Sequence, residues 1–145
     1  MKKKYWIIVA AAVLALAAVL AIFSVPRKME RVMDLPDAAP AAMSGGVTVS
    51  IHEDIKNYKT DDAQEMARVL ELLRAMKVKY VGGSDAYAVG GRDANVGMAF
   101  ADGSSRHFFF AENGTVRYDD KNYFCEDKAA LEELMNIICG WDASK

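Results

Sequence analysis

The sequence contains only two cysteines, three prolines and two histidines among its 145 residues. So few cysteines exclude a small domain that is held together by disulfides. A second long apolar run is also missing, which excludes a polytopic membrane protein. An excess of basic side chains is missing from residue 47 onward: residues 47–145 carry 12 basic and 17 acidic side chains, a net charge of −5. Because a surface that binds nucleic-acid phosphates has to be basic, we expect no nucleic-acid partner.

One long apolar run is present near the N-terminus. Residues 5–25 contain 20 apolar residues out of 21, whereas the other 124 residues contain 56. As a helix, this run is about 31 Å long, which is enough to cross the hydrocarbon of a bilayer. A basic n-region, residues 1–4, precedes it, and Pro26 ends it. We therefore predict a transmembrane helix or signal anchor over residues 5–25, with the lipid bilayer as its partner.

Two interpretations of this run compete, an uncleaved anchor and a cleaved signal peptide. The run is longer than the 7–15 apolar residues typical of a cleavable signal, and the bulky sequence Ile22–Pro26 follows in place of a small-x-small site. The anchor is therefore favoured. Lys2–Lys4 on one side balance Arg27, Lys28 and Arg31 on the other, and the free N-terminus and Glu30 favour a cytoplasmic N-terminus. We predict a single-pass protein of the cell membrane with its C-terminal domain outside.

The segment that follows, residues 26–46, shows no sustained helical or strand periodicity. It contains all three prolines of the protein and closes with Ser44-Gly45-Gly46. Proline and glycine at such density are typical of an extended tether. The pattern predicts a flexible linker over residues 26–46.

Residues 47–141 have the pattern of one α+β domain, followed by a short tail, residues 142–145. The pattern predicts a strand over 47–51, a helix from Thr60 to Met76, a meander of short strands, and a helix from Asp127 to Gly140. The expected meander strands are 78–81, 86–89, 95–101, 106–112, 115–118 and 122–125. Asn113-Gly114 is the strongest hairpin signal among them. This order predicts an antiparallel sheet with both helices packed on one face.

The residues that could carry chemistry are few. His52 and His107 lack the spacing of a zinc site, and no C-x-x-C motif exists, so no metal or cofactor is expected. Cys125 and Cys139 fall near opposite ends of the predicted last helix, too far apart for an internal disulfide. Two buried free thiols are favoured, with an intermolecular bridge as the alternative. A nucleophile–base pair of Cys125 with His107 stays open, although no catalytic motif surrounds either residue.

An aromatic group on the predicted meander is the most suggestive feature. Phe108 and Phe110 project to one face of their strand and Phe109 to the other, and Tyr118, Tyr123 and Phe124 follow. Either the last helix or a loop covers these rings, or they form a binding surface. The candidate interaction surface consists of Phe108, Phe110, Tyr118 and Tyr123.

Several short motifs carry a resemblance to a known group of proteins. They are Lys59-Thr60-Asp61-Asp62 before an amphipathic helix, Ala101-Asp102-Gly103 and Glu112-Asn113-Gly114 after aromatic strands, and Tyr123 before the helix with Leu131 and Leu134. With these motifs, residues 47–140 resemble the small membrane-anchored extracytoplasmic domains of unknown function in Gram-positive Firmicutes. The resemblance implies an anchored domain outside the membrane and no particular activity.

These observations favour a single-pass, non-enzymatic module that binds another envelope protein or a wall component. Two alternatives are a secreted, inhibitor-like domain released by signal cleavage, and an enzyme with a composite site.

Overall fold

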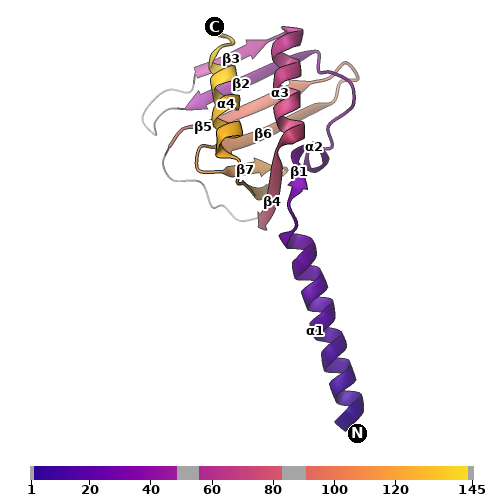
Figure 1. Ribbon diagram of the computed structural model, residues 1–145. Coiled ribbons are helices and arrows are strands. Elements are labelled where there is room, and N and C mark those ends of the chain that lie inside the picture. The colour runs from indigo at the N-terminus through magenta and orange to yellow at the C-terminus, as the bar shows by residue number, and fades with distance from the viewer. Residues whose placement is uncertain (1, 49–55, 83–90, 144–145) are drawn as a thin grey trace.

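The computed structural model describes residues 2–48, 56–82 and 91–143. Its helices are α1 (Lys2–Ser24), α2 (Met29–Val32), α3 (Ala63–Ala75) and α4 (Lys128–Cys139). Its strands are β1 (Arg27–Lys28), β2 (Ala42–Thr48), β3 (Lys56–Thr60), β4 (Lys77–Gly82), β5 (Asp93–Ala99), β6 (Ser105–Ala111), β7 (Thr115–Tyr118), β8 (Lys121–Cys125) and β9 (Asp142–Ala143). Helix α1 projects away from a domain formed by all the other elements (Figure 1).

The strands form one antiparallel sheet in the order β1-β4-β8-β7-β6-β5-β2-β3-β9. The α+β class and the antiparallel sheet are therefore confirmed. The expected meander exists only from β5 to β8, because β4 pairs with β8 at one end of the meander and β2 pairs with β5 at the other. Two-residue strands, β1 and β9, lie at the two edges. The expected strand at 86–89 lies outside the described residues, and so do residues 49–51 of the first expected strand.

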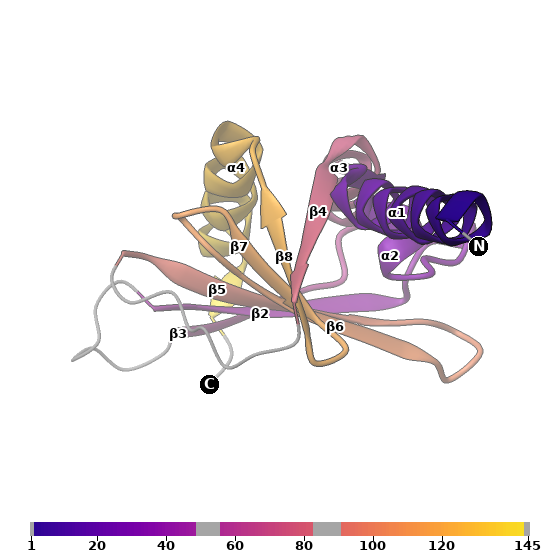
Figure 2. The ribbon, with the colours of Figure 1, turned by 90° about the horizontal axis from the view of Figure 1, so that it is seen from below.

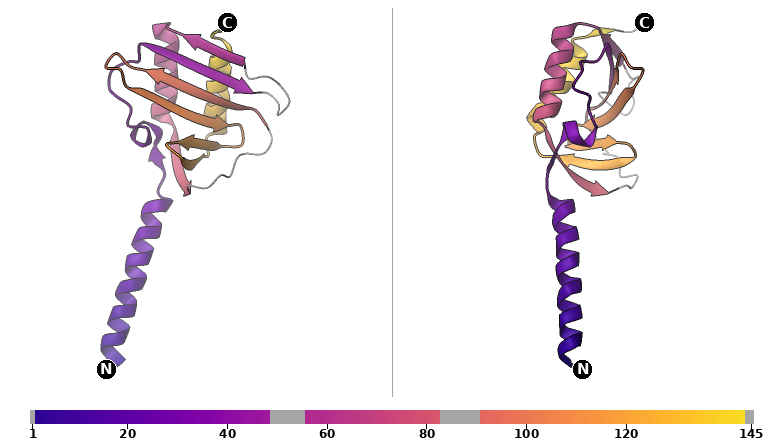
Figure 3. Two further views of the ribbon diagram at one scale, coloured as in Figure 1. Left: turned by 180° about the vertical axis from the view of Figure 1, so that it is seen from behind. Right: turned by 90° about the vertical axis from the view of Figure 1, so that its right-hand side faces the viewer.

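Helices α3 and α4 lie side by side on the same face of the sheet (Figure 1), as the pattern predicts. The sheet is strongly bent, so that β4 and β8 turn toward the helices (Figure 2). The opposite face is free of helices in the part of the chain that the structure describes (Figure 3). The fold thus has one buried face and one open face.

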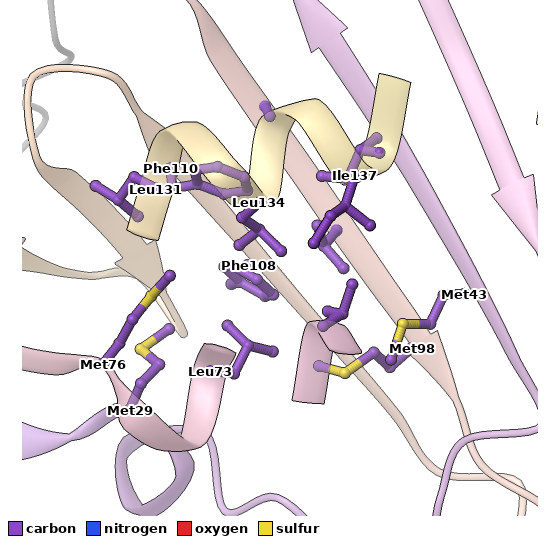
Figure 4. Close-up of a cluster of buried hydrophobic side chains, with 14 of the residues drawn as sticks. Met29, Met43, Leu73, Met76, Met98, Phe108, Phe110, Leu131, Leu134 and Ile137 are labelled. Carbon is purple, nitrogen blue, oxygen red and sulfur yellow. The ribbon is translucent and has the colours of Figure 1, made fainter. Parts of the chain in front are cut away.

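The core lies between the sheet and the two helices. Helix α3 contributes Met66, Val69, Leu70 and Leu73, and helix α4 contributes Leu131, Leu134, Met135, Ile137 and Ile138. Both sets repeat at the three- and four-residue spacing of one helix face. Apart from Met1, every methionine is buried in this core, namely Met29, Met33, Met43, Met66, Met76, Met98 and Met135. Figure 4 shows Met29, Met43, Met76 and Met98 among these buried side chains. Unbranched methionine side chains fill an irregular space between a bent sheet and two helices.

The helix ends follow the sequence signals closely. Asp62 is the N-cap of α3 and accepts hydrogen bonds from the backbone N–H groups of Gln64 and Glu65, at 2.8 and 3.0 Å. Thr60, where the sequence pattern placed the start of the helix, lies before α3 and accepts a hydrogen bond from the N–H of Asp62. Asp127 caps α4 by accepting from Ala130 N at 3.0 Å, and Gly140 is its C-cap. Both helices therefore begin at acidic side chains that satisfy otherwise unpaired N–H groups.

Gly45 is a packing residue and not a mark of flexibility. A Cβ atom at this position would lie 2.8 Å from Ile138 Cγ2 and 3.3 Å from the ring of Trp141. The missing side chain lets α4 approach β2 closely, which any larger residue would prevent.

The interpretation of residues 26–46 as a flexible linker is wrong. This segment contains β1, α2 and the first five residues of β2, and Met29 and Met33 within it are 1% and 0% exposed. The physical reason is that the two methionines, one turn apart, bury enough apolar surface against α3 to fix the segment. The domain thus begins at residue 27 and not at 47. At the other end, the predicted tail 142–145 starts with β9, which pairs with β3.

The hairpin at Asn113-Gly114 is confirmed, but it lacks the two positive φ angles of the turn that Asn-Gly favours in hairpins. Gly114 N donates to Ala111 O at 3.0 Å, and of the two residues only Gly114 has a positive φ, +102°. The turn with two positive φ angles is instead Asp119–Asp120, at 50° and 56°, between β7 and β8. Aspartate tolerates this conformation less well than glycine.

Replacing Asp120 by glycine is expected to raise the free energy of unfolding by about 0.5–1 kcal/mol, because it relieves the positive φ. The Arg117–Asp120 ion pair that is lost is 3.1 Å long, but the Asp120 side chain is almost fully exposed, so the pair contributes little. Asp120→Ala is the control, since it removes the same charge and keeps the strain. Thermal unfolding of the full chain in detergent checks the prediction, and equal stability of the two variants would contradict it.

Candidate functional site at the junction of helix and domain

Two of the four residues of the candidate interaction surface are core residues. Phe108 and Phe110 are 4% and 0% exposed and stack on each other, with ring centroids 5.5 Å apart. They lie beneath α4 beside Leu131 and Leu134 (Figure 4). The prediction that they form a binding surface is wrong, because the last helix covers this face of β6. Phe109, on the open face, is half-buried.

The other two residues, Tyr118 and Tyr123, are half-buried and lie where the N-terminal segment meets the sheet. The Tyr118 hydroxyl donates to the carbonyl oxygen of Met33 at 3.1 Å. Tyr123 makes an edge contact with Tyr80, with ring centroids 5.7 Å apart. The structure therefore brings both tyrosines to one region, the junction between α1 and the domain.

Backbone pairing fixes the chain immediately after α1. Only Val25 and Pro26 separate the end of α1 from β1, which pairs antiparallel with β4 at Arg27↔Val78 and Lys28↔Lys77. The N–H of Met29 then donates to Met76 O at 2.9 Å. Since α1 itself contacts β4, the membrane-length helix and the sheet edge are directly connected.

Arg106 provides the second attachment. From β6 it reaches the end of α2, where its Nε donates to Met33 O at 2.9 Å and its Nη2 to Asp34 O at 3.2 Å. These carbonyls follow the last turn of α2, where backbone acceptors lack helical partners. A guanidinium donor at a helix C-terminus is also favoured by the direction of the peptide dipoles. Through hydrogen bonds to Met33 O, Arg106 and Tyr118 thus bind the α2 segment, which precedes them by more than 70 residues in the sequence.

Sequence reasoning missed this role of Met29, Met33 and Arg106. The signal that could have found it is the i, i+4 spacing of the two methionines, with Val32 beside Met33. One turn of apolar spacing among prolines is a weak pattern, and nothing in the local sequence pairs it with Arg106.

Burial raises the pKa of the Tyr118 phenol above its usual value of 10.0, while the nearby Arg106 charge partly opposes this shift. Because the folded state then holds the proton more tightly than the unfolded state, this contribution to stability is complete below pH 10 and is lost as the pH rises beyond it. The phenol donates to Met33 O only in its protonated form.

Replacing Tyr118 by phenylalanine is expected to lower the free energy of unfolding at pH 7 by about 0.5–1.5 kcal/mol, through loss of this hydrogen bond. Above pH 10 the difference between the unmodified chain and the variant should shrink, because deprotonated Tyr118 no longer donates. Chemical denaturation between pH 7 and pH 11 measures both effects. A difference that stays constant over this range would contradict the assigned bond.

Two grooves flank β1 at the junction. The larger, about 590 Å³, lies along the residues from Val25 to Val32, with Tyr123 in its wall. The smaller, about 250 Å³, is lined by Lys77 and Lys79 and also by Glu126 and Asp127. Pro26 lines both. The larger groove carries three cations, Arg27, Lys28 and Arg31, and no carboxylate among its lining residues.

The histidines and cysteines do not come together in the described residues. His107 is exposed on the open face, where its ring covers Gly97, and Cys125 is buried in the core on the other face. The candidate pair of these two residues is therefore not formed. His52 lies outside the described residues. No group of three or more His, Cys, Asp or Glu side chains suited to a metal ion occurs within the described part of the chain.

Both cysteines are free, as expected, but only Cys125 is buried. The prediction of two buried thiols is wrong for Cys139, which sits at the exposed C-terminal end of α4. Burial raises the pKa of the Cys125 thiol, partly opposed by a backbone hydrogen bond from Asp127, so the reactive thiolate is scarce at neutral pH.

Titration of the folded chain with a thiol reagent at pH 7.5 is therefore expected to modify one cysteine rapidly and the second only after unfolding. The Cys139→Ser variant should lose the fast phase, and the Cys125→Ser variant should keep it. Rapid modification of both thiols in the folded chain would contradict the burial of Cys125.

The chain matches no protein-family model, no curated protein and no solved structure. The described residues include one helix that is long and apolar enough to cross a membrane, with its apolar window at Lys4–Ala21. This window is not buried against the domain. The fold and the junction therefore define the class to which the chain can be assigned: an α+β domain fixed to an N-terminal apolar helix.

Proposed function

We propose that the protein is a single-pass protein of the cell membrane that holds its α+β domain at the membrane surface. In this proposal α1 spans the bilayer as an uncleaved anchor, the N-terminus is cytoplasmic and the domain is outside. The observation that carries it is the junction: an unburied apolar helix ends two residues before a strand of the domain. Such a helix is covered by lipid, since exposure of about 20 apolar side chains to water is unfavourable.

We further propose that the domain is a non-enzymatic binding module for another envelope protein or a wall component. The open face of the sheet supports this role (Figure 3). Across β2, β5 and β6 it presents Ser44 and His107 in one cross-strand row, with Gly97 buried between them under the His107 ring, and Asn95 and half-buried Phe109 in the next row. The polar groups on this face are available for hydrogen bonds to a protein partner, and the ring of Phe109 for an apolar contact.

Membrane attachment and orientation can be tested on the full chain in bacterial cells. We expect it to stay in membranes after an alkaline carbonate wash at its full mass of 15.9 kDa. A membrane-impermeant maleimide should label exposed Cys139 in intact cells, and Cys139→Ser should abolish the labelling. A mature protein that begins beyond residue 25 would overturn the anchor, and labelling only after lysis would overturn the orientation.

The binding role needs a separate test on the open face. A photo-crosslinking residue at His107 is expected to give a discrete crosslinked product in intact cells. The matched control carries the same residue at Gln64, which is exposed on α3 above the opposite face of the sheet. Identical products from both positions, or none from His107, would contradict the assignment of this face.

A further inference from the structure

We infer that the larger groove at the junction binds the phosphate headgroup of an anionic phospholipid. The inference deepens the proposed function and rests on the membrane anchor described there. It concerns the groove of about 590 Å³ between Val25 and Val32, whose wall includes Tyr123.

The position of the groove favours a membrane lipid as its occupant. Val25 directly follows the last residue of α1, and Arg27 follows two residues later, at most about 7 Å further along the chain. With α1 across the bilayer, the groove lies at the level of the headgroups. The direct connection of β1 to β4 keeps it there, since the segment cannot swing away on a tether.

The charge of the groove matches a phosphate. Its lining contains Arg27, Lys28 and Arg31, all exposed, and no carboxylate. The Glu30 carboxylate lies 3.5 Å from Lys28 Nζ and 4.0 Å from Arg74 Nε. The charge of Lys28 is therefore partly neutralised by this ion pair. Among the ion pairs formed by the described residues, none includes Arg27 or Arg31. A guanidinium can bind phosphate oxygens through two parallel hydrogen bonds, which makes these two arginines the principal ligands.

The apolar part of the groove matches the remainder of a lipid. Val25 and Val32 line the groove together with the cations, and the ring of Tyr123 lines it from β8. A tyrosine with an apolar body and a polar tip is suited to the boundary between headgroups and hydrocarbon. The smaller groove lacks this match, because the carboxylates Glu126 and Asp127 line it together with its two lysines.

The test uses the full chain in detergent micelles with equal amounts of phosphatidylglycerol and phosphatidylcholine of the same acyl chains. Native mass spectrometry measures which lipid stays bound. We expect roughly a thirtyfold preference for phosphatidylglycerol, which Arg27→Gln with Arg31→Gln reduces to about twofold or less. The matched control removes two cations from the far end of the domain, Lys56→Gln with Lys59→Gln, and should keep the full preference.

The following results would overturn the inference. A lipid ratio near one for the unmodified chain, or an equal loss in both double variants, would show that the groove does not select the headgroup. Complete displacement of phosphatidylglycerol by about 10 mM inorganic phosphate would identify a site for free anions. Both double variants should melt within a few degrees of the unmodified chain, since all four side chains are exposed. If the chain resists the carbonate wash but shows no lipid preference, the result contradicts only the lipid site and leaves the proposed membrane anchor intact.

Discussion

Replacing Met33 by alanine is expected to lower the free energy of unfolding by about 2–5 kcal/mol. Met33 is 0% exposed and belongs to the hydrophobic core, so its truncation leaves a cavity there. Two hydrogen bonds to its carbonyl, from Arg106 and Tyr118, hold the backbone in place and limit its collapse into that cavity. Chemical denaturation of the full chain in detergent measures the change.

Met33→Leu is the matched control, because it nearly conserves side-chain volume and should cost less than about 1.5 kcal/mol. If residues 26–46 were a tether, both variants would unfold like the unmodified chain. Equal stability of Met33→Ala and Met33→Leu would therefore contradict the docking of this segment.

Replacing Phe110 by alanine is expected to cost about 3–5 kcal/mol, the second large effect. Phe110 is fully buried beneath α4 and stacks on Phe108, so its loss removes contacts with both the helix and the neighbouring ring. A phenylalanine on a binding surface would instead affect binding and leave stability unchanged.

Phe124 serves as the control for Phe110, since it is the same residue type at 36% exposure on β8. Phe124→Ala should cost less than about 1.5 kcal/mol, because most large changes in stability come from buried positions. Thermal and chemical unfolding of the two variants side by side measures the contrast. Similar losses in both would contradict the assignment of Phe110 to the core.

Local sequence signals correctly predicted those features of the fold that depend on a single helix, strand or turn. Asp127 and Gly140 mark the ends of α4 because a cap depends only on the first and last turns of its own helix. Strand β7 lies at the expected residues for a similar reason, since short hairpin turns bound it on both sides. Alternation in β6 likewise placed Phe108 and Phe110 on a common face.

Contacts between distant segments account for the differences. Alternation could not tell that α4 covers Phe108 and Phe110, because that depends on how a helix 20 residues later crosses the sheet. In residues 26–46 the prolines and Gly45-Gly46 suggest a tether. Gly45 instead lacks a side chain so that Ile138 of α4 can pack closely against the backbone of β2. The hydrogen-bond partners of Met29 and Met33 are Met76, just after α3, and Arg106 on β6, which are separated from them by tens of residues. A local pattern carries no information about such pairing.

The candidate site also combines features that the sequence predicted with features that depend on distant contacts. Tyr118 and Tyr123 were selected for their aromatic character, and both lie at the junction, where one holds Met33 and the other lines the larger groove. The cations of that groove were visible in the sequence as a juxtamembrane group. Their fixed position was not, because it depends on the pairing of β1 with β4.

The central claim is that α1 and the domain form one body through β1 and α2. The most direct measurement is a spin-label distance between a cysteine introduced at Val25 and the native exposed Cys139, in lipid nanodiscs. We predict a single distance with a spread of a few Å. A flexible tether of about 20 residues would instead spread the distances over about 25 Å, and such a broad distribution would contradict the claim.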